Sequence, residues 1–355
     1  MLNSNGPQRF VADFRVSING SELPRAAYAD LMSVAVYEDV DALSMFTLHF
    51  ANWSLTESTV TWSDDALMSP GNEVEVKMGY VDQLESLLKA EITGLEPEFI
   101  AGEVPSVIVR GYDRRHRLMR GRKTKSFTQV KDSDIASQIA TDAGLSSQVK
   151  DTGVTLDYVL QHNQTDYEFL QARARRIGYE VAIDDKTLLF QPFQNTQSET
   201  LTLELDDLLE FSPRLTSVGQ VGGVDVRGWN VKDKEAIVAQ ASAGGLASTM
   251  GGASTGPSAA DGAFGAATMT FVTYPVFTRA EADKIAQGQL EDMALAYIMG
   301  EGQVEGTPDL RAGSVIKLKG IGARFSGLYY VTATAHVYSP HRGYRTSFSI
   351  RRNAT

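Results

Sequence analysis

Apolar and polar residues alternate in two stretches that lie far apart in the chain and share one pattern. Residues 71–80 and 313–322 each begin at a glycine, alternate apolar with polar positions and then reach another glycine. Two further pairs of segments correspond in the same order: residues 90–95 with 330–335, and residues 107–112 with 348–353. Alternation with a period of two is typical of strands. The pattern predicts one β-domain used twice, so that three chains around an axis present six similar units.

Strand patterns fill the first β-domain, which we predict over residues 1–112. Residues 9–18 alternate and run into Asn19-Gly20, a dipeptide that favours a hairpin turn because both positions tolerate positive φ. The further predicted strands cover residues 31–40, 44–50, 72–80, 88–95 and 104–111.

The hydrophobic period changes to that of helices in residues 113–200. A helix is predicted from Asp132 to Gly144, with Ile135 and Ile139 on its apolar face. A second helix is predicted from Thr165-Asp166 to Gly178, followed by strands at residues 179–183 and 187–190. These elements predict an inserted α/β domain.

The second β-domain is predicted over residues 201–355, with strand patterns from residue 218 onward. Residues 239–269 consist almost wholly of Ala, Gly, Ser and Thr, and we predict a flexible loop because they offer little apolar surface to bury. A long helix is predicted over residues 279–298, opened by the capping box that Thr278 and Glu281 form. The predicted fold class is α+β, mostly β: two similar tube-forming, barrel-like β-domains with an inserted α/β domain.

The composition of the 355-residue chain narrows the classes of function. Hydrophobic content of 43% and charged content of 22% are ordinary for a globular protein. The chain has no cysteine, which excludes disulfides and thiolate chemistry. Its formal net charge of −11 argues against a dedicated nucleic-acid binder. No apolar run approaches the roughly 20 residues that span a bilayer, and Met1–Pro7 lacks the features of a secretory signal.

One short segment is nevertheless strongly basic. Its cations are Arg114, Arg115, Arg117, Arg120, Arg122, Lys123 and Lys125. Such a run is either a solvated connector or a docking patch for an acidic partner or neighbouring subunit. The sequence leaves both interpretations open, and these residues are the candidate partner-docking residues.

Motifs for catalysis, cofactors and metals are weak or absent. Residues 252–256 match the nucleophile-elbow motif Gly-x-Ser-x-Gly. The flanking sequence, rich in Ala, Gly and Ser, predicts neither the preceding strand nor the following helix that an elbow requires. The five histidines are scattered, without a His-Glu-x-x-His motif, and no Walker loop or dinucleotide fingerprint is present. We therefore predict no catalytic residue, no cofactor and no metal site.

Two regions carry a family resemblance. Residues 166–181, followed by Leu188-Leu-Phe-Gln-Pro192, have an Asp, an aromatic-Leu pair, a helix, a Gly-aromatic pair and a strand hairpin. The C-terminal part adds Leu310–Gly313, residues 325–331, His336 and residues 343–348. In this order and spacing the chain resembles the late control D family, the baseplate hub proteins of contractile phage tails. That family is related to the N-terminal part of type VI secretion spike proteins.

The resemblance implies a structural protein without enzymatic activity. Hubs of this kind form homotrimeric, pseudo-hexameric rings that join a hexameric tail tube to a trimeric spike. The implied partners are other copies of the chain, the tail tube, spike and tape-measure proteins, and other baseplate or wedge proteins. The implied location is the tail baseplate of a virion, or an injection particle, assembled in the bacterial host cytoplasm. Neither specific nucleic-acid binding nor stable membrane insertion is expected. The alternative is a tail-associated cell-wall hydrolase or glycan-binding module.

The chain departs from larger relatives of the late control D family because it carries no OB-like, lysozyme-like or needle region before Thr355. Its spike is thus expected to be a separate protein, or the sequence to be truncated. If the ring encloses a channel, we expect an acidic or neutral wall, because cationic walls would hold passing DNA. The candidate wall residues in the first β-domain are Glu73, Glu75, Glu91, Glu96 and Glu98. Alternation does not decide which face they occupy.

Overall fold

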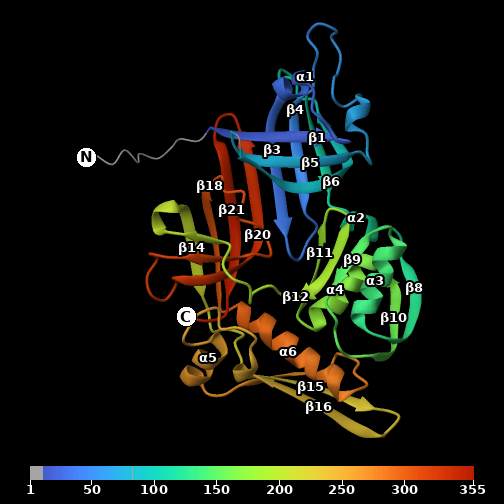
Figure 1. Ribbon diagram of the computed structural model, residues 1–355, viewed down its shortest axis with the longest axis vertical. Helices are drawn as coiled ribbons and strands as arrows, with labels where there is room; N and C mark the ends of the chain where they lie inside the picture. Colours follow the sequence, from blue (N-terminus) through green and yellow to red (C-terminus); the bar gives the residue numbers. More distant parts are fainter. Residues whose placement is uncertain (1–10, 82) are drawn as a thin grey trace.

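The computed structural model describes residues 11–81 and 83–355, and a sheet of 13 strands runs through most of its length (Figure 1). The N-terminal strands are β1 (Ala12–Ile18), β2 (Ser21–Glu22), β3 (Leu31–Asp39), β4 (Met45–Ala51), β5 (Glu73–Tyr80), β6 (Gln83–Glu98) and β7 (Ser106–Tyr112), with the short helix α1 (Arg25–Asp30) between β2 and β3. The C-terminal strands are β13 (Leu201–Leu203), β14 (Leu208–Leu215), β18 (Ile298–Glu305), β19 (Val315–Leu318), β20 (Gly327–Ser339) and β21 (Gly343–Arg352). Of the predicted strand at residues 9–18, Arg9 and Phe10 lie outside the described residues.

The sheet contains the same arrangement of strands twice. In the first β unit the spatial order is β3-β4-β7-β6-β5, and in the second it is β14-β18-β21-β20-β19. Both units have irregularities at the same places: the β3–β4 and β14–β18 ladders each shift register once, as do the β6–β7 and β20–β21 ladders. The predicted duplication is thus visible as two β units with matching topology.

The glycines that opened the sequence pattern have equivalent places in the two units. Gly71 donates its backbone N–H to Ile92 O at 2.8 Å, and Gly313 donates to Val331 O at the same distance. Both glycines have positive φ, +95° and +82°, which favours glycine because it lacks a Cβ. These bonds make Ile92 equivalent to Val331. The predicted alignment of residues 90–95 with 330–335 is therefore wrong by one residue.

The third pair of segments is also displaced. Gly111 pairs with Ile92 in the first unit, and Ile350 pairs with Val331 in the second. The equivalent of Gly111 is therefore Ile350, two residues away from the predicted match. The bulges in the β6–β7 and β20–β21 ladders stand at equivalent places, so they do not cause this displacement. Alternation marks the strands, but it does not fix which residues of distant segments are equivalent.

A hydrogen-bonded ladder joins the two β units within the chain. Strand β20 of the second unit pairs with β3 of the first from Ala333–Asp39 to Tyr338–Val34. The core of the first unit lies between β1 and β5 on one side and β3 and β4 on the other (Figure 1). It contains Val16, Phe46 and Phe50, which are fully buried. Tyr344 of β21 also packs into this core, so side chains as well as backbone cross the joint.

The inserted part of the chain lies between β7 and β13. Its elements are α2 (Arg115–Leu118), β8 (Lys123–Val130), α3 (Asp132–Asp142), β9 (Ser146–Val149), β10 (Leu156–Gln164), α4 (Asp166–Arg176), β11 (Tyr179–Asp184) and β12 (Thr187–Pro192). Helix α4 begins where the sequence predicts, because Thr165 and Glu168 form a capping box there. Helices and strands share a buried cluster that includes Ile135, Leu170 and Phe190.

A further layer inserted between β14 and β18 covers one end of the second β unit. It contains β15 (Gly223–Asn230), β16 (Glu235–Ser242), α5 (Gly256–Phe264), β17 (Thr268–Phe271) and α6 (Arg279–Leu295). Helix α6 packs its apolar side on β15 and β16 (Figure 1). It ends three residues before the predicted boundary because Ile298 begins β18. No helix within the described ranges is long and apolar enough to cross a membrane.

The structure corrects the predicted loop over residues 239–269. The segment contains the end of β16, helix α5 and the start of β17. Its small residues permit close packing: a Cβ on Gly252 would lie 2.6 Å from the Ala354 Cβ, and a Cβ on Gly256 would lie 2.4 Å from the Tyr297 ring. Low apolar content here reflects close approach of the backbone rather than a lack of packing partners.

Candidate assembly interface

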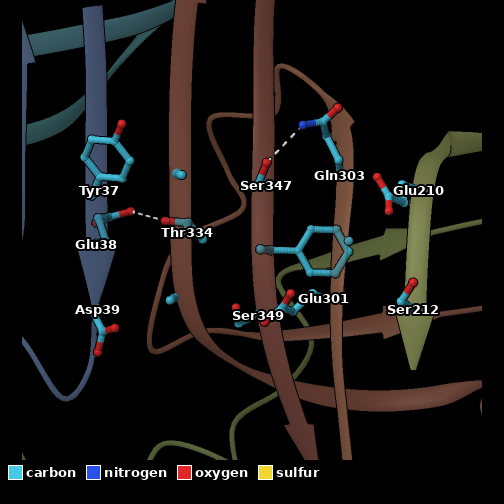
Figure 2. A pocket seen from close by; sticks show the side chains of 14 residues that line it. Tyr37, Glu38, Asp39, Glu210, Ser212, Glu301, Gln303, Thr334, Ser347 and Ser349 are labelled. Atoms are coloured by element: carbon cyan, nitrogen blue, oxygen red, sulfur yellow. Dashed lines mark hydrogen bonds between the residues drawn. The ribbon is translucent and has the colours of Figure 1, made fainter. Parts of the chain in front are cut away.

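The side of the sheet opposite the core forms a polar surface, which we call the polar sheet face. A hollow of about 500 Å³ lies on it across β14, β18, β21, β20 and β3 (Figure 2). Figure 2 shows Gln303 and Glu301 from β18, Ser347 and Ser349 from β21, and Tyr37 from β3 along this hollow. Its bonds are structural: Gln303 donates to Ser347 Oγ at 3.1 Å, and Thr334 donates to Glu38 at 3.0 Å.

The strand register extends the polar sheet face from the second β unit onto the first. Residues paired across a ladder share a face, so Ala335, Tyr37, Met45 and Tyr112 form one continuous row. Along β14, β18, β21, β20, β3, β7 and the second half of β6, the acids on the face are Asp39, Glu96, Glu98, Glu210, Glu301 and Glu305, and the bases are Arg110, Arg214, Arg345 and Arg351. Acids outnumber bases, and some are paired in the chain, such as Glu96 with Arg110 at 2.9 Å.

The predicted wall residues divide between two environments. Glu96 and Glu98 lie on the polar sheet face. Glu91, paired with Tyr112, and Glu73, paired with Glu91, lie on the same side of their ladders but bond to the basic segment: Glu73 lies 2.7 Å from Arg114, and Glu91 accepts from Arg117 at 2.9 Å. Glu75 lies on β5, beside Glu73, and accepts from Ser86 at 2.8 Å.

Two cations of the basic segment are buried within ion-pair clusters. The Arg114 side chain is 2% exposed and contacts Glu73, Glu91 and Asp185, so it links β5, β6 and the β11–β12 turn. Arg115 is equally buried: it forms a 2.7 Å ion pair with Asp113 and donates to Val181 O at 3.0 Å. Burial excludes both arginines from any docking surface in this conformation.

Electrostatics in this cluster follow from the ion pairs. Burial alone would raise the pKa of Glu91, but hydrogen bonds from Arg117 and His116 outweigh it, and the pKa of this carboxyl falls below its usual value. Burial lowers the pKa of Arg115, and the attraction of Asp113 more than compensates, so the net shift is upward. The cluster is therefore charged on both sides and holds the first β unit against the inserted elements.

Of the five remaining cations of the basic segment, four are exposed and Lys125 is half-buried, and four of the five have carboxylate partners. Arg117 pairs with Glu91, and the other pairs are Arg122 with Glu168, Lys123 with Asp166 and Lys125 with Asp142. Arg120 is exposed, and its side chain forms no salt bridge with a described residue. The concentration of positive charge seen in the sequence is thus largely neutralised by acids distant in the chain, a pairing for which sequence offered no signal.

Two of the strand edges left unpaired among the described residues of the large sheet belong to β14 and to the second half of β6. Strand β14 pairs with β18 but has no partner on its other side among the described strands. The second half of β6, from Gly94 to Glu98, pairs with β7 alone, because its ladder with β5 ends at Glu91. These edges carry Pro97 on β6 and Pro213 on β14, and no sequence pattern singled out the two prolines.

Chemistry outside these surfaces is sparse. Ser254 of the Gly-x-Ser-x-Gly pattern precedes α5, so a helix follows it, contrary to the prediction, but no strand leads into it. His336 is fully buried and contacts Tyr344 at 2.8 Å and Leu310 O at 3.0 Å. Burial lowers the pKa of His336 to about 4, so the ring is neutral near pH 7. No group of three His, Asp or Glu residues in the described part of the chain is placed to hold a metal ion.

This duplicated sheet with its inserted α/β elements defines a fold found in tail proteins. A prophage tail protein from Shewanella oneidensis matches it with a TM-score of 0.70 at 13% identity, over 96% of this chain and 98% of that one. A tail protein from Neisseria meningitidis matches with a TM-score of 0.69 at 13% identity, over 97% of each chain. A component of the Escherichia coli type VI secretion system, described as structurally similar to two phage T4 tail proteins, matches with a TM-score of 0.60 at 14% identity, over 96% of this chain and 77% of that one.

The family follows from a sequence comparison. The Alg8 N-terminal domain family matches residues 8–339, so the chain belongs to that family. No curated protein sequence matches the chain. The predicted kinship with phage tail proteins and with type VI secretion proteins is confirmed at the level of the fold. The late control D assignment in particular stays a prediction.

Proposed function

We propose that this chain is the hub of a contractile tail or injection apparatus, a homotrimeric ring that joins a hexameric tube to a trimeric spike. Its partners in this role are two further copies of itself, the tail tube, spike and tape-measure proteins, and baseplate or wedge proteins. Its place is the baseplate of a virion tail or injection particle, assembled in the bacterial host cytoplasm. The proposed role is structural and needs no active site, cofactor, nucleic-acid specificity or membrane insertion. The tail-protein fold supports it.

The observation that carries the proposal is the joint between the β units. Strand β20 of the second unit pairs with β3 of the first. The equivalent of β20 in the first unit is β6, and the equivalent of β3 in the second unit is β14. Both of these strands have a free edge among the described residues. Each chain thus offers one further copy of the joint that it already contains, and three chains repeating it close a ring of six similar units.

Channel and periphery follow from the same geometry. In such a ring the polar sheet face lines the channel, and its excess of acids suits the passage of DNA or an anionic cargo. We propose three domains, 1–112, 113–200 and 201–355, in which the inserted domain lies outside the ring. The exposed cations Arg117, Arg120, Arg122 and Lys123, with the half-buried Lys125, then form the candidate docking patch toward an acidic wedge protein or neighbouring subunit.

Electron microscopy of the chain assembled with its tube protein tests the ring directly. The expected result is a threefold-symmetric ring with six β units around a channel. A particle in which the chain is present as a single copy, or in which β6 and β14 remain unpaired, contradicts the proposal. A lytic assay on bacterial peptidoglycan tests the structural role separately, because measurable lysis would favour the alternative of a cell-wall hydrolase.

A further inference from the structure

The equivalence of the two β units fixes the register of the joint between neighbouring chains, if the ring proposed above is formed. Ala333 is equivalent to Gly94, and Val36 to Pro213, because matching bulges align the ladders on both sides. Transferring the β20–β3 ladder to β6 and a neighbouring β14 gives the pairs Leu95–Leu215, Glu96–Arg214, Pro97–Pro213, Glu98–Ser212 and Phe99–Phe211. The two prolines therefore face each other in the middle of the joint.

The direction of each proline nitrogen follows from hydrogen bonds within the chain. Asn52 donates to Pro105 O at 2.7 Å, so the alternation of an antiparallel ladder directs the polar backbone groups of Val107 toward β4. Pro97, which pairs with Val107, must then direct its own nitrogen away from β7, toward the free edge. Thr216 donates to Tyr297 O at 2.9 Å, and the same reasoning directs the nitrogen of Pro213 toward the free edge of β14.

The joint within the chain has no such interruption. Val40 donates to Thr332 O at 3.0 Å, so the hydrogen-bonded pairs that follow are Thr334–Glu38, His336–Val36 and Tyr338–Val34. The pair His336–Val36 occupies the place that Pro97–Pro213 takes between chains. The pair His336–Val36 of the joint within the chain (the internal joint) makes two backbone hydrogen bonds. The pair Pro97–Pro213 of the joint between chains (the external joint) makes none, and each pyrrolidine ring lies against the carbonyl of the opposite proline.

We propose that Pro97 and Pro213 keep free chains from joining by strand pairing, so that the ring closes only when tube or spike holds the chains in place. Prolines on sheet edges are a known means of preventing edge-to-edge association. Here the transferred register keeps hydrogen-bonded pairs only at Leu95–Leu215 and Phe99–Phe211, on either side of the prolines, so the external joint depends more on its side chains. Leu95 faces Leu215, Phe99 faces Phe211, and Glu96 faces the oppositely charged Arg214. Phe99 is 63% exposed in the single chain, which leaves it available for this contact.

Restoring the missing donors tests the proposal. The double variant Pro97→Val and Pro213→Val regains two backbone hydrogen bonds at each joint, and we expect association at each joint to tighten roughly 5- to 150-fold. Sedimentation velocity over a concentration series should show trimers of the double variant at concentrations where the wild-type chain is monomeric. Each single variant should have at most an intermediate effect. Pro192→Val, at the end of β12 and on neither edge, is the matched control and should behave as wild type.

A second pair, Pro97→Thr with Pro213→Thr, guards against a variant that fails to fold, and a thermal melt of each variant checks the fold. Trimer formation by either double variant, with wild-type melting, supports the proposal. Double variants that stay as monomeric as wild type overturn it. Open-ended oligomers larger than a trimer overturn it as well, because they show edges that pair without closing a ring.

Cross-linking separates this proposal from the ring itself. The chain has no cysteine, so single-cysteine chains Glu98→Cys and Ser212→Cys can form only intermolecular disulfides when mixed. We expect a disulfide between positions 98 and 212 in particles assembled with the tube protein. Glu210→Cys, two residues along β14, should form far less disulfide with Glu98→Cys. Linking at 98–212 with no effect of the proline changes refutes the proline mechanism and leaves the ring standing. Absence of this link in every assembly refutes both.

Discussion

Arg311 makes a contact between the β units whose removal has a calculable cost. The residue precedes β19 of the second unit, yet its guanidinium bonds Glu38 of β3 at 2.6 and 2.8 Å and donates to Ser86 O at 3.2 Å in the first unit. The Glu38 side chain is only 12% exposed. The variant Arg311→Ala therefore leaves a largely buried carboxylate without its cation.

Removing one partner of a buried ion pair costs about 3–5 kcal/mol, because the remaining charge keeps its desolvation penalty. We expect Arg311→Ala to lower the free energy of unfolding by that amount. Urea unfolding followed by the fluorescence of Trp62, which is buried in the first β unit, measures the change. The exposed Arg279, 3.8 Å from Asp283, is the matched control, and Arg279→Ala should change stability by less than about 0.5 kcal/mol.

The double variant Glu38→Gln with Arg311→Met sharpens the test. It removes both charges while keeping similar side-chain volume, so its cost should be well below that of Arg311→Ala alone. If Arg311→Ala unfolds at the same urea concentration as Arg279→Ala, the contact contributes nothing to the joint. The reasoning that Glu38 and Arg311 hold the two β units together would then be wrong.

Three further predictions concern other parts of the fold. The folded-state pKa of His336, about 4, lies below its ordinary value of 6.5, so between these pH values the unfolded chain binds a proton that the folded chain does not. We expect this residue to leave the free energy of unfolding unchanged above pH 6.5 and to lower it by about 3 kcal/mol as the pH drops to 4. His336→Gln should remove this dependence in unfolding curves recorded at several pH values. Gly288→Val places a Cβ 2.4 Å from backbone atoms at Ile177, where α6 meets the end of α4, and should lower the free energy of unfolding by about 1–3 kcal/mol, whereas Gly262→Ala on α5, with open space around it, should not. Thr255→Ala removes the side-chain cap of α5 at a cost of about 1 kcal/mol and should speed proteolysis within residues 239–269. If the wild-type chain is cleaved there as fast as the variant, the flexible loop predicted from sequence is the better description.

The amino-acid sequence by itself determined the features that depend on neighbouring residues. Alternation revealed the strands of both β units, Gly71 and Gly313 marked equivalent turns, and the capping residues Thr165 and Thr278 marked where α4 and α6 begin. These signals are readable because a strand period, a positive φ or a cap involves only a few adjacent residues.

Only the tertiary structure decided what distant segments do to one another. It showed that the basic segment is largely paired with acids far along the chain, and that Arg114 and Arg115 are buried. It showed that Gly252 and Gly256 approach Ala354 and Tyr297 closely. It also showed that Pro97 of β6 and Pro213 of β14 lie on strand edges that have no partner among the described residues. Burial, ion pairing and edge status depend on which strands become neighbours, and no local pattern records that choice.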